Sequence, residues 1–153
     1  IKLLGKYDYS YDILVFPHQL GSVLELTKKF PNQKFVIDHI GKPYIFDNFY
    51  YGWATLIKEI GKQENVYCKL SGMITEADHK NWKKEQIEPY MDLVMESFGP
   101  RKLMFGSDWP VCLVAGNYYE VKKLVTDFIS SYSPNEQNLI MYENAINFYN
   151  LKI

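Results

Sequence analysis

The sequence predicts an α/β fold built around a parallel β-sheet. Four short apolar runs recur along the chain, and they are near-continuous rather than alternating, which is typical of strands buried on both faces. Each run is followed by a polar or Gly/Pro-containing stretch and then by a segment of helical period. Strands and helices that alternate in this way form a parallel sheet through right-handed crossovers.

The strands are predicted from short runs rich in β-branched and aromatic residues, at 13–16, 35–38, 66–70 and 103–105. Apolar residues at i, i+3, i+4 and i+7 predict three helices, over 52–62, 84–98 and 118–130. A shorter and less regular pattern predicts a further helix over 22–30.

The two ends of the chain are also predicted to be helical. Residues 1–10 have the character of the tail of an earlier helix. The motif Ser133-Pro134-Asn135-Glu136 has the form of a capping box, with proline at the first helical position, and predicts the start of a final helix. The longest stretch without clear periodicity is 72–83, which predicts an ordered or functional loop.

Composition excludes several classes of protein. The 153 residues suit one domain of ordinary size, and 17 basic against 18 acidic residues leave no global charge to attract nucleic acid or an anionic membrane. No apolar run approaches the ~20 residues needed to span a bilayer, and the N-terminus does not have the pattern of a signal peptide. Cys68 and Cys112 are isolated, which favours a reducing, cytoplasmic compartment over a disulfide framework.

Polar residues follow each predicted strand, and they are the candidates for chemistry. His18 follows the first strand, His39 the second and Asp108-Trp109 the fourth, while Lys69 lies inside the third. The carboxyl ends of parallel strands share one edge of the sheet, and this edge is where α/β folds bind ligands. The sequence therefore predicts that these side chains converge on one site.

Asp108 and His39 are the candidates for catalysis and for metal binding. A carboxylate just past a buried strand can take a proton from water or ligate a metal, although an Asx-turn or helix cap explains Asp108 about equally well. His39 can bind a metal or polarise a carbonyl, with a structural histidine as the alternative.

Lys69, His18 and Trp109 are the candidates for substrate binding. An ammonium in an apolar strand is costly without a partner, so Lys69 is expected either to bind a carbonyl or carboxylate or to form a structural ion pair with Asp38 or Asp108. His18 follows Pro17 in a loop, and the residues alone favour a structural role for it. Trp109 is a candidate to stack on a substrate, with core packing as the alternative.

The residues at these strand ends resemble one family. The segments 36–43, 67–72, 103–110 and 143–149 are similar, in the same order, to motifs of the amidohydrolase-related family of TIM-barrel hydrolases, which includes lactonases acting on L-fuconolactone and L-rhamnonolactone. The resemblance implies that residues 1–153 are the C-terminal half of an eight-stranded barrel, with strands five to eight and the closing helix. Such barrels have about 250 residues.

The resemblance also implies roles for individual residues. Asp108 resembles the last-strand aspartate that activates the hydrolytic water, and His39 resembles the sixth-strand histidine that orients substrate or, in some members, ligates a metal. Lys69 resembles a seventh-strand residue that faces the substrate. A divalent metal such as zinc is one cofactor that the family implies. The His-x-His pair of the family's first strand is missing, so either the chain belongs to a longer protein or the full site does not exist in it.

The leading functional hypothesis is therefore hydrolysis of a sugar-derived lactone by water that Asp108 activates. One alternative is another reaction of the amidohydrolase type, either amide hydrolysis or nonoxidative decarboxylation. A second alternative is a half-barrel without activity that serves in binding or assembly. Unpaired strand edges would favour a homo-oligomer in that case.

Overall fold

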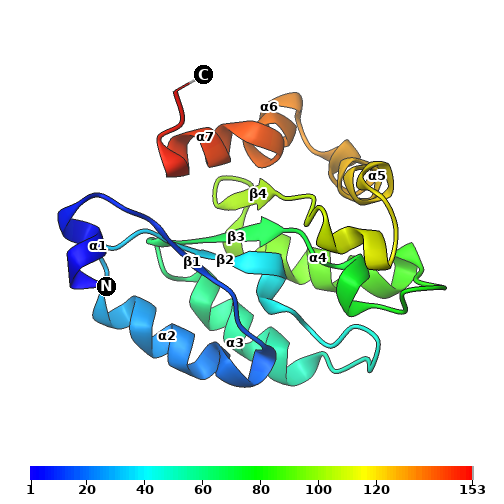
Figure 1. The fold of residues 1–153 in the computed structure, drawn as a ribbon, viewed down its shortest axis with the longest axis horizontal. Coiled ribbons are helices and arrows are strands. Elements are labelled where there is room, and N and C mark those ends of the chain that lie inside the picture. Colours follow the sequence, from blue (N-terminus) through cyan, green and yellow to red (C-terminus); the bar gives the residue numbers. More distant parts are fainter. Residues whose placement is uncertain (153) are drawn as a thin grey trace.

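The computed structural model of the protein describes residues 1–152 and contains one four-stranded parallel sheet in the order β1-β2-β3-β4. The strands are Tyr11–Ile13, Phe35–Ile37, Val66–Leu70 and Leu103–Phe105. Phe35 of β2 lies between Tyr11 of β1 and Val66 of β3, and Cys68 of β3 pairs with Leu103 of β4. The predicted α/β class with a parallel sheet is confirmed (Figure 1).

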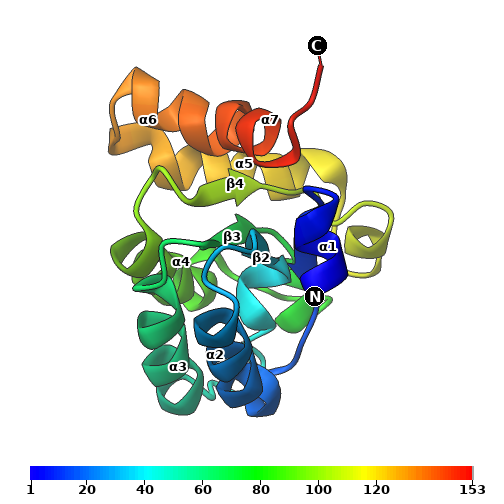
Figure 2. The same ribbon diagram turned by 90° about the vertical axis from the view of Figure 1, so that its left-hand side faces the viewer.

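Helices lie on both sides of this sheet. The helices are α1 (Lys2–Lys6), α2 (Leu20–Lys29), α3 (Tyr51–Gly61), α4 (Lys84–Phe98), α5 (Tyr118–Phe128), α6 (Pro134–Asn138) and α7 (Asn144–Tyr149). Helices α2, α3 and α4 pack below β2 and β3, whereas α5, α6 and α7 lie beyond β4 (Figures 1 and 2). Within residues 1–152, no helix is both long enough and apolar enough to cross a membrane.

Most predicted helices are confirmed, with small differences at their ends. Helix α4 has the predicted bounds. The helix predicted over 118–130 ends at Phe128 and continues as one turn of 3-10 helix, Ile129–Ser131. Ser133 caps α6 through the predicted capping box, and a π-helical segment, Leu139–Glu143, connects α6 directly to α7. Helix α1 occupies only the first part of the predicted helical tail 1–10.

The first strand was predicted in the wrong place. It covers Tyr11–Ile13 instead of 13–16, and Leu14 and Phe16 are exposed. The partner strand β2 is only three residues long, so it pairs with three residues of β1. The backbone N–H of Phe16 donates to the Gln19 side chain at 2.9 Å, which begins a turn of 3-10 helix instead of extending the strand.

Two apolar clusters hold the layers together. The larger one packs helices α2, α3, α4 and α5 against the sheet and includes Phe35, Ile37, Cys68 and Trp53, all fully buried. The smaller cluster lies on the opposite face, where Phe148 of α7 packs against Val36 and Met104. This opposite face, called here the inner face of the sheet, is only partly covered. Strand β3 therefore alternates between buried and half-buried residues and is not buried throughout as predicted.

Candidate active site

The carboxyl end of β2 runs into a segment of unusual backbone conformation. His39, Ile40, Gly41 and Lys42 all have positive φ, between 46° and 74°. Positive φ is strained for residues other than glycine, and for β-branched Ile40 above all. Such strain costs about 1–3 kcal/mol per residue and persists only where the surroundings enforce it. Here Ile40 is fully buried and its carbonyl accepts a 2.8 Å hydrogen bond from Nε1 of Trp53.

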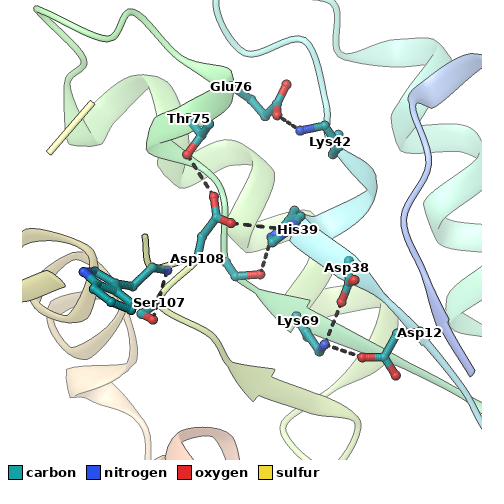
Figure 3. A network of polar contacts seen from close by, with 11 residues as sticks. Asp12, Asp38, His39, Lys42, Lys69, Thr75, Glu76, Ser107 and Asp108 are labelled. Atoms are coloured by element: carbon teal, nitrogen blue, oxygen red, sulfur yellow. Dashed lines mark hydrogen bonds and ion pairs between the residues drawn. The ribbon is translucent and has the colours of Figure 1, made fainter. Parts of the chain in front are cut away.

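This backbone directs His39 toward Asp108, which follows β4 and also has positive φ (56°). The two atoms that face each other, Nε2 of His39 and Oδ1 of Asp108, are 3.6 Å apart (Figure 3). The His39 side chain is 20% exposed and that of Asp108 is 9% exposed, so the pair is accessible but largely shielded from water. The structure thus brings together the two residues predicted as catalytic, at the predicted edge of the sheet.

The remaining polar atom of each side chain contacts a hydroxyl group. Nδ1 of His39 lies 2.8 Å from Oγ of Ser71, and Oγ1 of Thr75 donates to Oδ2 of Asp108 at 3.0 Å. Both hydroxyls belong to the loop that follows β3. Neither Ser71 nor Thr75 was among the predicted site residues. Ser71 lies in the segment 67–72, which resembles the family, and Thr75 lies in the aperiodic stretch 72–83.

The same loop is attached to the strained segment by an ion pair between Glu76 and Lys42. Both side chains are largely buried, at 12% and 19% exposure. A pocket of about 360 Å³ adjoins this loop, and its lining includes Thr75, Glu76, Tyr44 and Phe46. Thr75 therefore contacts Asp108 and also lines the adjoining pocket.

Lys69 lies in a separate charged cluster on the inner face of the sheet. Its Nζ is 2.6 Å from Oδ2 of Asp12 and 2.7 Å from Oδ1 of Asp38 (Figure 3). The Tyr149 hydroxyl of α7 donates to Asp12 at 2.7 Å. A structural ion pair of Lys69 with Asp38 or Asp108 was expected, and the pair with Asp38 is present; the second partner, Asp12, was not predicted.

Burial and hydrogen bonding in this charged cluster shift the pKa values of Lys69 and Tyr149. Burial by itself would lower the pKa of Lys69, but hydrogen bonds to Asp12 and Asp38 outweigh burial and hold that pKa well above its ordinary value. Burial, followed by the hydrogen bond to Asp12, raises the pKa of Tyr149 to about 12. Lys69 therefore remains a cation and Tyr149 remains a neutral donor at physiological pH.

His18 and Trp109, the other predicted substrate-binding residues, lie at the periphery. Nδ1 of His18 is 3.3 Å from the Tyr44 hydroxyl, and its ring stacks on Phe16. Trp109 follows Asp108 directly, has a cis peptide bond to Pro110 and is 63% exposed. Among the described contacts, none joins either residue to His39, and their part in substrate binding stays a prediction.

The family resemblance implies a divalent metal as one cofactor, with His39 and Asp108 as candidate ligands, and the side chains present allow a test of fit. Protein zinc sites use three or four protein ligands. Among residues 1–152, no group of three or more His, Cys, Asp and Glu side chains is arranged to hold a metal ion. His39 and Asp108 offer only one free donor atom each, since Ser71 and Thr75 engage the others. The described part of the chain therefore does not form a metal site by itself.

Comparison with known proteins agrees with this geometry. The family model described as Amidohydrolase matches residues 1–151, and the chain belongs to this family. It is 40% identical over 133 residues to an L-fucono-1,5-lactonase of Burkholderia multivorans, covering 81% of this chain and 45% of that protein. It is 30% identical over 153 residues to an L-rhamnono-gamma-lactonase of Scheffersomyces stipitis, covering 87% of this chain and 45% of that protein.

A solved structure is similar over almost the whole chain. A crystal structure of an amidohydrolase from Burkholderia multivorans with bound zinc superposes with a TM-score of 0.94 at 38% identity, covering 98% of this chain and 55% of that one. The chain spans about half the length of the proteins that it matches. The four parallel βα units thus correspond to about half of an amidohydrolase TIM barrel.

Proposed function

We propose that this chain carries the second half of the barrel of a sugar-lactone hydrolase, with Asp108 and His39 as its catalytic residues. The observation that carries the proposal is the 3.6 Å approach of Asp108 Oδ1 to His39 Nε2 at the carboxyl edge of a parallel sheet. The similarity to an L-fucono-1,5-lactonase and to an L-rhamnono-gamma-lactonase supports the substrate class.

The two groups have complementary chemistry. Asp108 accepts a proton from water as the water oxygen attacks the lactone carbonyl carbon, which leaves a tetrahedral oxyanion. The ring N–H of His39 donates a hydrogen bond to this oxyanion. When the intermediate collapses, the ring C–O bond breaks and the departing alkoxide takes the proton from Asp108. The product is the open hydroxy acid, and Asp108 returns to its carboxylate form.

The experiment is a substrate panel read by proton release and product analysis. The chain is assayed alone and as a hybrid in which it replaces the matching segment of the Burkholderia multivorans L-fucono-1,5-lactonase. L-Fucono-1,5-lactone and L-rhamnono-gamma-lactone are compared with simple amides and carboxylated aromatic compounds. We expect the hybrid to hydrolyse the lactones and to leave the other two classes unchanged.

Two results would overturn the proposal. One is a folded hybrid, with the far-UV circular dichroism of the parent lactonase, that does not open either lactone. The other is faster amide hydrolysis or decarboxylation than lactone opening. Light scattering of the chain alone tests the remaining alternative, because an inactive hybrid combined with a stable homo-oligomer would favour an assembly module.

A further inference from the structure

The loop 71–76, which follows β3, contacts both catalytic candidates and the segment that carries one of them. Ser71 contacts His39, Thr75 contacts Asp108, and Glu76 pairs with Lys42 of the strained segment. The proposed reaction uses none of the residues of this loop. Figure 3 shows that the loop lies beside the pair, so that Thr75 approaches Asp108 on the side away from His39.

The contacts with Asp108 and Ser71 together favour one arrangement of the proton on the His39 ring. An ionised carboxylate only accepts hydrogen bonds, so a neutral His39 ring faces Asp108 favourably only when its Nε2 is protonated. Nδ1 then has a lone pair, and the Ser71 hydroxyl, 2.8 Å away, donates to it. Ser71 is 1% exposed, so no bulk water competes for this contact.

The position of Ser71 is set by tight packing on its other side. A Cβ added at Gly106, the residue after β4, would lie 3.0 Å from Cβ of Ser71. The lack of a side chain at Gly106 thus lets β4 approach Ser71 closely. This packing limits how far the hydroxyl can move from the His39 ring.

Thr75 orients the Asp108 carboxylate in the way that Ser71 orients the His39 ring. The Thr75 hydroxyl donates a hydrogen bond to Oδ2 of Asp108, and the other oxygen, Oδ1, faces His39. Thr75 is itself held in place, because its carbonyl accepts a 2.8 Å hydrogen bond from Nε2 of His79. One short loop thereby fixes both the imidazole and the carboxylate.

We propose that Ser71 and Thr75 are the positioning residues of the His39–Asp108 pair, Ser71 by holding His39 in the Nε2–H tautomer and Thr75 by turning Oδ1 of Asp108 toward that N–H. The kinetic part of this proposal rests on the proposed function. The tautomer and the orientation are properties of the folded chain, and they are measurable whether or not it hydrolyses lactones.

The first test is ¹⁵N NMR of the three histidine rings, with the His39 signals assigned by their loss in His39→Gln. We expect the Nε2–H tautomer in the wild type and a mixture of tautomers in Ser71→Ala, with Ser71→Cys, a weaker donor of similar size, in between. Thr75→Val should shift the Nε2 signal of His39, and Thr75→Ser should restore it. Thr55→Val is the control, because it removes an exposed hydroxyl on α3 that bonds only within its own helix.

The second test is kinetic and uses the lactonase hybrid. Thr75→Val is expected to lower kcat about tenfold or more with little change in KM, Thr75→Ser to restore it, and Thr55→Val to have no effect. A wild-type His39 in the Nδ1–H form, or ring signals that neither Ser71→Ala nor Thr75→Val changes, overturns the positioning roles. An inactive wild-type hybrid with the expected NMR changes contradicts the proposed function alone.

Discussion

Gly72 lies directly against the ring of His39. A Cβ added at Gly72 would be 2.7 Å from Cβ of His39 and 2.9 Å from its Nδ1, distances that real side chains do not adopt. Gly72 also has a φ of +68°, which favours glycine independently of the space around it. The loop after β3 can therefore bring Ser71 to His39 only because the next residue has no side chain.

The cost of this close approach can be separated from the cost of the backbone conformation. Gly99, after α4, has nearly the same φ (+67°), but nothing lies within 4 Å of an added Cβ. Gly99 has a ψ of 167°, a conformation that essentially only glycine adopts, so Gly99→Ala is expected to lower the free energy of unfolding by about 1–3 kcal/mol from backbone strain alone. Gly72→Ala should cost roughly a further 1–3 kcal/mol from overpacking against His39. Urea unfolding of both variants checks this, and equal losses would contradict the close packing.

Asp108→Asn should leave the fold intact and reduce lactone turnover by the lactonase hybrid. Asparagine keeps the shape of the side chain but cannot accept a proton from water, and general-base catalysis contributes about 10²–10⁴-fold in rate. We expect a loss in kcat of that order with a similar melting temperature. Asp8→Asn is the control, since Asp8 is exposed, pairs with Lys34 and precedes the amino end of β1, whereas Asp108 follows the carboxyl end of β4. Unchanged turnover in Asp108→Asn would remove Asp108 from the mechanism.

Lys69→Met should destabilise the chain because it leaves the carboxylates of Asp12 and Asp38 without their cation. Removal of one partner from a fully buried ion pair costs 3–5 kcal/mol, and the partial exposure of this cluster reduces the expected loss to about 2 kcal/mol. Lys123→Met removes an exposed helical ion pair with Asp127 and should cost about 0.5 kcal/mol or less. Urea unfolding measures the free energy lost in each variant. Equal losses in Lys69→Met and Lys123→Met would contradict a stabilising role for the Lys69 cluster beyond that of an exposed ion pair.

The raised pKa of Tyr149 predicts a pH dependence of stability. The folded chain holds this phenolic proton up to about pH 12, whereas the ordinary value is 10.0. The folded state therefore binds more protons than the unfolded state in this window, and the contribution of Tyr149 is complete below pH 10 and decreases as the pH rises toward 12. Wild type should lose more unfolding free energy than Tyr149→Phe between pH 9 and pH 11. Tyr119→Phe, at an 80% exposed position, should behave as wild type.

The rule that strand ends converge was sufficient to predict that His39 and Asp108 meet, because it depends only on the order of strands and not on their lengths. It failed for Asp12, because β1 begins two residues before the predicted strand and Asp12 lay outside it. Ser71 and Thr75 are common residue types whose roles depend on contacts between loops. The left-handed backbone at His39 and Ile40 was not predictable, since β-branched Ile40 disfavours it and one histidine, although more tolerant of it, is a weak signal.

The hydrogen bond from Tyr149 to Asp12 joins residues 137 positions apart. At a translation rate of about 5–20 residues per second, Asp12 is synthesised on the order of ten seconds before Tyr149. During that interval Lys69 can already neutralise Asp12, but Val36 and Met104 on the inner face have no Phe148 to cover them. The cover that Phe148 gives to Val36 and Met104 therefore forms late in synthesis, and a truncation that removes α7 would take it away.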